Sequence, residues 1–265
     1  MLKKQLVFYF HIPDDYETNV AIKMHYACLW KYRDIFDIVE FFISCTENSK
    51  KYLMSVKYSL LNIFENKDIR FKEVENDSFC EVRAFKENII DKLDTFENTL
   101  VFFGHTKGTT NVTNYPERVP NILKWIYALY FYSLEFMYEV EKKLIGAYYG
   151  RFRSIFGSLS TVAKEGQHLY YPGTFYWMNP MAITNDINNR EIVVPKMADR
   201  IYAEFFPSVY KHDEYFMGKT DGHNGVMAAD GTFDYYQCNF DDVVRYYGDY
   251  DLFMKNYNEL IKEIQ

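Results

Sequence analysis

The sequence predicts an α/β protein with a mainly parallel sheet flanked by helices, of the general Rossmann type. Short apolar segments alternate with amphipathic ones as far as residue 105, in the order β-α-β-α-β-α-β. Such alternation is typical of parallel strands joined by crossover helices. The chain has 265 residues and is 48% hydrophobic, which suits one large core and argues against long disordered stretches. We expect a single domain over residues 1–265, with halves at about 1–118 and about 119–265.

The first half contains the clearest elements. Its strands are apolar and rich in aromatic residues, and its helices show apolar positions at helical spacing. No GxGxxG follows the first strand and no GxxxxGK[ST] occurs, so a dinucleotide-dependent dehydrogenase and a P-loop enzyme are both unsupported. The expected elements are a strand at 5–12, a helix at 20–36, a strand at 37–45, a helix at 50–64, a strand at 68–75, a helix at 85–96 and a strand at 98–105.

The second half is less regular. A long helix follows Pro120, with an apolar stripe that indicates packing against the core. A segment with several glycines and no periodicity is expected to form a loop. The remaining elements are a strand and turn at 168–183, a helix at 197–210, the loop at 217–236 and an amphipathic helix at 251–264.

Composition narrows the class of protein. The net charge of -7 gives no reason to expect a nucleic-acid partner. The four cysteines are far apart and form no CxxC pair, which indicates reduced thiols rather than a zinc site or disulfide framework. The N-terminal apolar run is too short for a signal peptide, and Glu135 interrupts the longest apolar stretch. We expect a cytoplasmic protein with no transmembrane segment, and peripheral contact at the inner face of the membrane stays open.

The stretch VFFGHTKGTTN at residues 101–111 marks the end of the fourth strand. Ligands of parallel α/β sheets bind outside the carboxyl ends of the strands. There Lys107 offers a positive charge suited to phosphate, His105 lies beside it, and the following small residues up to Asn111 leave the backbone accessible. The alternative is that His105 and Lys107 merely cap a surface turn.

Other strands end in polar residues that we expect to converge on the same edge. His11 is followed by Asp14 and Asp15 after the first strand, and residues 46–49 follow the second. Glu81 comes after the third strand.

Several motifs resemble those of bacterial glycosyltransferase-like proteins of polysaccharide and rhamnan synthesis, which have a GT-A-like fold. The segment HTKG follows an aromatic strand, and Trp125 lies further along the chain. Upstream is Glu81 in FCEVRAF, and downstream is GTFYWMNP at residues 173–180, similar to the GNFWWAN-like segment of that group. A helix with a glutamate follows, matched by Glu204 in RIYAEFFPS. The resemblance covers about residues 5–210.

The resemblance implies transfer of a sugar from a nucleoside diphosphate sugar to a glycan or lipid-linked glycan in surface polysaccharide synthesis. The halves would then be a nucleotide-binding half and an acceptor half. GT-A enzymes usually place Asp-x-Asp after the fourth strand to hold a divalent metal, but here His105-Thr106-Lys107 occupies that place. Either Lys107 neutralises the leaving diphosphate without a metal, or the domain has lost donor binding. No cofactor is certain, and Mn²⁺ or Mg²⁺ is the open alternative.

The same resemblance assigns roles in the second half. Gly173, Thr174 and Trp177 would form the floor beneath the donor sugar, although about half of any such strand must face the core. Glu204 is the candidate general base, because an inverting transfer needs a carboxylate near the acceptor hydroxyl.

Two further residues lie beyond that helix. Asp213 is an alternative carboxylate, and His223 lies in a glycine-rich loop that could close over the diphosphate.

Two other functions fit the same sequence. One is phosphoryl transfer or hydrolysis on a sugar, which would need a divalent metal and carboxylates such as Asp14 and Asp15. The other is a degenerate transferase domain that binds saccharide without turnover.

Overall fold

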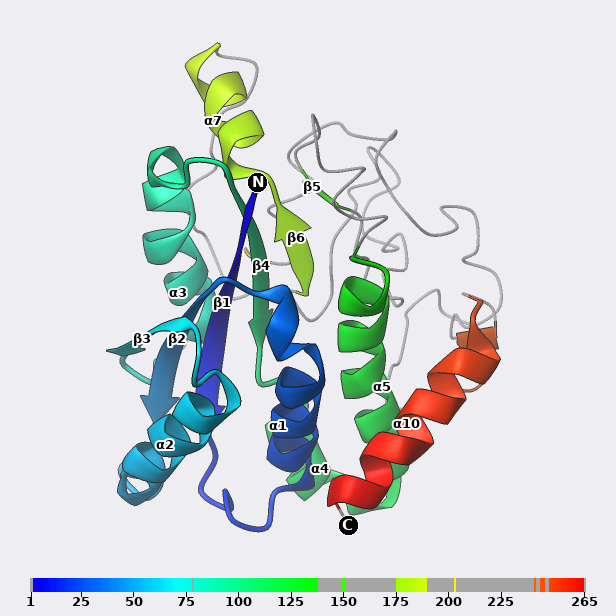
Figure 1. Ribbon diagram of the computed structural model, residues 1–265. Coiled ribbons are helices and arrows are strands. Elements are labelled where there is room, and N and C mark those ends of the chain that lie inside the picture. The colour runs from blue at the N-terminus through cyan, green and yellow to red at the C-terminus, as the bar shows by residue number, and fades with distance from the viewer. Residues whose placement is uncertain are drawn as a thin grey trace, which may run out of the picture.

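The structure is a computed structural model of the whole chain (Figure 1). It describes residues 2–77, 79–137, 149–150, 175–189, 203, 241, 244–245 and 248–264. The helix expected at 197–210, apart from Ala203, and the loop expected at 217–236 lie outside the described residues.

The described strands form one mixed, mainly parallel sheet in the order β3-β2-β1-β4-β6-β5. β1, β2, β3 and β4 are parallel, while β6 is antiparallel to both β4 and β5. This confirms the α/β class and the four parallel strands expected in the first half. The strands are β1 (Lys3–Ile12), β2 (Ile38–Cys45), β3 (Asp68–Glu73), β4 (Thr99–His105), β5 (Tyr149–Gly150) and β6 (Tyr176–Met178).

Helices cover both faces of the sheet (Figure 1). The chain moves in one direction from β1 to β3 and then crosses back to β4, so right-handed crossovers place α1 and α2 opposite α3. Phe8 of β1 accordingly packs against His25 of α1, whereas Phe103 of β4 packs against Phe85 of α3. The helices are α1 (Val20–Tyr32), α2 (Leu53–Ile63), α3 (Cys80–Asn88), α4 (Thr109–Asn114), α5 (Val119–Tyr130), α7 (Pro180–Asn188) and α10 (Tyr250–Ile264).

Short helical turns join several of these elements. They are η1 (Arg33–Ile35), η2 (Lys50–Tyr52), η3 (Ile90–Thr95), η4 (Pro116–Arg118) and the π-turn η5 (Phe131–Glu135). The helix expected at 85–96 is in fact two elements, because the backbone leaves the helical region at Ile89 (φ -120°, ψ -62°). Glu81 in the first turn of α3 favours the earlier start, since a carboxylate there interacts with the positive end of the helix dipole.

The arrangement of strands creates a topological switch point. β1 pairs with β2 on one side and with β4 on the other, so successive connections lead away from this position in opposite directions. Crevices at such points, outside the carboxyl ends of the strands, are the usual ligand sites of open α/β sheets.

Candidate functional site

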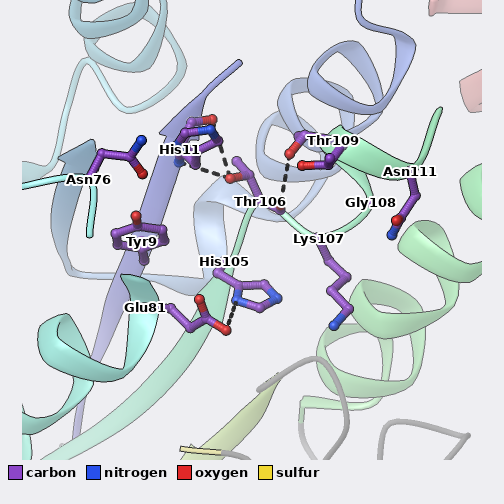
Figure 2. Close-up of a pocket in the computed structure, with 11 residues that line it drawn as sticks. Tyr9, His11, Asn76, Glu81, His105, Thr106, Lys107, Gly108, Thr109 and Asn111 are labelled. Carbon is purple, nitrogen blue, oxygen red and sulfur yellow. Dashed lines mark hydrogen bonds and ion pairs between the residues drawn. The ribbon is translucent and has the colours of Figure 1, made fainter. Parts of the chain in front are cut away.

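A cavity of about 370 Å³ opens at the carboxyl ends of β1 and β4 (Figure 2). Its volume is in the range of small-molecule sites. The expectation that the polar strand ends converge is met in part. His11, Glu81, His105, Lys107 and Asn111 share this cavity, whereas Asp14, Asp15 and residues 46–49 do not line it. Its lining comprises Tyr9, His11, Asn76, Glu81, His105, Thr106, Lys107, Gly108, Thr109, Thr110 and Asn111.

A hydrogen-bonded pair of cavity residues links helix and sheet. Nδ1 of His105, at the end of β4, lies 3.4 Å from Oε1 of Glu81 on α3, and both side chains are buried. Burial alone would raise the pKa of Glu81, but the opposing effects of His105 and Lys107 lower it to about 2. The ionised carboxylate can only accept, so Nδ1 of His105 carries the hydrogen in this pair.

Lys107 follows His105 in a tight turn, in which the Lys107 amide donates to the His105 carbonyl oxygen at 2.8 Å. Its side chain extends beside His105 in Figure 2. The Lys107 ammonium lies 5.2 Å from the ring centroid of Trp125 on α5, a cation–π contact. Lys107 therefore presents positive charge at the position where the sequence predicted a phosphate contact.

The buried side chain of His25 on α1 stabilises this turn. Its Nε2 lies 2.8 Å from the Lys107 carbonyl oxygen and its Nδ1 lies 2.9 Å from the Tyr130 hydroxyl. Burial lowers the pKa of His25 to about 3, so the ring is neutral at neutral pH. A carbonyl can only accept, which puts the hydrogen on Nε2 and makes Nδ1 the acceptor for Tyr130. Sequence reasoning missed His25, because a single histidine within an apolar helical stripe carries no motif.

Gly108 completes the turn and precedes α4. Its φ is +83°, and a Cβ there would lie 2.9 Å from Cγ2 of Ile122. The glycine is thus required both by the backbone conformation and by the packing of α5. Asn19, at the start of α1, links this helix to the residue after Gly108. Its Nδ2 donates to the Thr109 carbonyl oxygen at 2.9 Å, and its Oδ1 caps α1.

Another set of hydrogen bonds connects residues at the end of β1, where His11 and Tyr9 line the cavity. Nδ1 of His11 lies 3.0 Å from Oγ of Ser44, which lies 2.6 Å from the hydroxyl of Tyr9. The His11 amide also donates to Oγ1 of Thr106 at 2.9 Å, which ties the ends of β1 and β4 together. Burial lowers the pKa of His11, and Asp14 and Glu81 partly oppose that shift.

Asp14 and Asp15 act within the turns rather than on the cavity. Asp14 accepts hydrogen bonds from Thr46 and from Nδ2 of Asn48, which lower its pKa. Asp15 accepts from Nδ2 of Asn19 at 2.9 Å and from the hydroxyl of Thr113 at 2.6 Å. Residues 46–49 therefore come close to the end of β1 as expected, but their contacts organise the loops.

Trp177 corrects one expectation. The residue is fully buried on β6, its ring stacks on Phe36, and Nε1 donates to the Ser133 carbonyl oxygen at 3.0 Å. A ring packed in this way has no face left for a sugar, so Trp177 belongs to the core.

The remaining candidates lie outside the described residues. They are Gly173, Thr174, Glu204, Asp213 and His223.

In the described ranges, no group of three or more His, Cys, Asp or Glu side chains is placed to hold a metal ion. None of the helices described is long and apolar enough to cross a membrane. No family model matches the chain, and no curated protein matches it.

Proposed function

We propose that the chain is a glycosyltransferase that moves a sugar from a nucleoside diphosphate sugar to a glycan or lipid-linked glycan. The observation that carries the proposal is the cavity at the β1/β4 switch point, where Lys107, His105 and His11 meet. The mainly parallel sheet and the HTKG segment at the end of β4 support the GT-A-like resemblance, which adds the reaction class.

In the proposed reaction, negative charge develops on the diphosphate as the bond to the sugar breaks. The ammonium of Lys107 stabilises this charge, and the turn held by His25 fixes its position before the substrate arrives. His105, whose ring is oriented by its Nδ1 hydrogen bond to Glu81, lies beside this charge in the cavity lining. A divalent cation brought with the nucleotide is the alternative source of positive charge. Glu204 or Asp213 as general base stays a prediction.

Phosphoryl transfer or hydrolysis is the other enzyme class considered. It would require carboxylates gathered around a divalent metal. The oxygens of Asp14 and Asp15 instead accept from different partners: Asp14 from Asn48 in the loop after β2, and Asp15 from Asn19 and from Thr113 of α4. The geometry therefore supports the glycosyltransferase better.

Calorimetry with nucleotide sugars tests the proposal. A thermal-shift screen of UDP-, GDP-, dTDP- and CMP-sugars, with Mn²⁺ or with EDTA, first identifies the donor. Lys107→Ala should then weaken its binding by about tenfold to a hundredfold, because a hydrogen bond to a charged group contributes about 1.5–3 kcal/mol. Lys23→Ala, which removes an exposed lysine on α1, is the matched control and should bind as wild type does.

Three results would count against the proposal. Unchanged donor affinity in Lys107→Ala removes the diphosphate role of that lysine. Glycan binding with no response to any nucleotide sugar favours the degenerate module. Activity on a sugar phosphate that EDTA abolishes favours the phosphotransferase.

A further inference from the structure

Helix α2 has two apolar faces, and only one of them is used within the fold. Val56, Leu60 and Ile63 are buried and pack into the core. On the opposite side Met54, Tyr58 and Leu61 are 70%, 67% and 42% exposed. Their spacing of i, i+4 and i+7 places them in one stripe along the helix surface. Three large apolar side chains in one exposed stripe indicate a binding surface rather than scattered surface residues.

The stripe is bordered by lysines. Lys50 and Lys51 lie in η2, four and three residues before Met54, so they extend the same side of the helix. Residues 50–64 contain no aspartate or glutamate, although the whole chain has a net charge of -7. Lys57 is also on this helix and pairs with Glu73 of β3 at 2.6 Å. The acidic residues near these lysines are Glu47, in the turn before η2, and Asp14, whose carboxylate interacts electrostatically with Lys51.

We propose that this face of α2 binds an anionic membrane surface. Apolar and aromatic side chains enter the boundary between headgroups and acyl chains, while lysines beside them reach the lipid phosphates. The chemistry of Met54, Tyr58 and Leu61 with Lys50 and Lys51 fits both requirements.

A second copy of the chain fits this face less well. A two-fold interface places the same patch of both copies against itself, so Lys50 and Lys51 of each copy would lie near those of the other. The lysines thus favour an anionic partner over self-association. The proposal does not rest on the glycosyltransferase activity, although a lipid-linked acceptor would be found at the same surface.

Vesicle co-sedimentation of the full chain tests the proposal. We expect binding to vesicles of phosphatidylcholine with about a third phosphatidylserine, and much weaker binding to phosphatidylcholine alone. Lys50→Ala with Lys51→Ala should reduce the partition coefficient about twenty-five-fold, because each lysine near an anionic surface contributes roughly fivefold. Met54→Ser, Tyr58→Ser and Leu61→Ser together should abolish binding.

Matched controls alter the same residue types elsewhere. Leu252→Ser on α10 and Lys23→Ala on α1 remove an exposed leucine and an exposed lysine outside α2, and both should bind as wild type does. All of the substituted side chains are at least partly exposed, and circular dichroism verifies that each variant is folded. Absence of wild-type binding to anionic vesicles overturns the proposal. So does equal binding of the double-lysine variant, or a wild-type dimer in light scattering that the triple variant loses.

Discussion

His25 should make the fold less stable as the pH falls below about 6.5. Its pKa is lowered by burial to about 3, against the ordinary value of 6.5 expected in the unfolded chain. The imidazole therefore stays neutral in the folded protein between these values, whereas the unfolded chain takes up a proton. Stability from this group is fully present above pH 6.5 and is lost as the pH falls toward 3.

The size of the effect follows from linkage between protonation and folding. One extra proton bound by the unfolded state changes the free energy of unfolding by at most about 1.4 kcal/mol per pH unit. Between pH 6 and pH 5, where the unfolded imidazole is mostly protonated, the expected loss is about 1 kcal/mol. Burial also lowers the pKa of His11, so the effect of His11 on the pH dependence must be measured separately from that of His25.

Urea unfolding at pH 7, 6 and 5 measures this loss. His25→Gln retains an amide donor for the Lys107 carbonyl but cannot be protonated. Its free energy of unfolding should therefore fall about 1 kcal/mol less than that of wild type from pH 6 to pH 5. His11→Gln run alongside gives the part due to His11. At pH 7, His25→Leu should cost about 2–5 kcal/mol, because the Lys107 carbonyl and the Tyr130 hydroxyl both lose their partner.

Two results would refute the reasoning. One is an identical pH slope for wild type and His25→Gln. The other is an NMR titration of His25 near pH 6.5 in the folded protein, which would mean that burial does not hold the ring neutral.

Three further substitutions and one control test the turn and the Glu81–His105 pair of the cavity by urea unfolding. Gly108→Ala should lower the free energy of unfolding by about 2–4 kcal/mol, because the backbone φ is +83° and a Cβ would come too close to Ile122. Gly248→Ala, with φ +97° and open space around it, should lose only about 1–2 kcal/mol; equal losses would exclude a packing effect at Gly108. Asn19→Ala removes the cap of α1 and should cost about 1–2 kcal/mol, and no change would show the cap to be unimportant. Because the pKa of Glu81 is about 2 when folded and 4.5 when not, wild type should lose about 1–2 kcal/mol from pH 4.5 to pH 3 that Glu81→Gln does not lose.

The strands and the common edge where their polar ends meet could be predicted from the sequence. Long apolar runs such as the one at 5–12 are unambiguous, and parallel strands bring their carboxyl ends together whatever the details of packing. This is why His11, His105 and Lys107 were placed in one cavity without knowledge of the side-chain contacts.

The supporting contacts could not be predicted, because they depend on tertiary packing. His25 acts through Tyr130 and Lys107, both distant in sequence. Trp177 is buried because Phe36 and Phe102 pack against its ring, and its neighbours Tyr176 and Met178 on the other face of β6 are buried as well. β6 runs antiparallel to β4, and the periodicity of apolar residues in the sequence does not encode the direction of a strand.

The position of β3 has a consequence for aggregation. It is the outermost of the described strands on its side of the sheet, and it carries Asp68, Arg70, Lys72 and Glu73. Charged side chains on an edge strand discourage pairing with strands of other molecules. β2 beside it is mostly apolar and has Glu40 as its one charged residue, so any event that detaches β3 would expose a more hydrophobic edge to such pairing. The charges of β3 therefore disfavour growth of the sheet into other molecules at this edge.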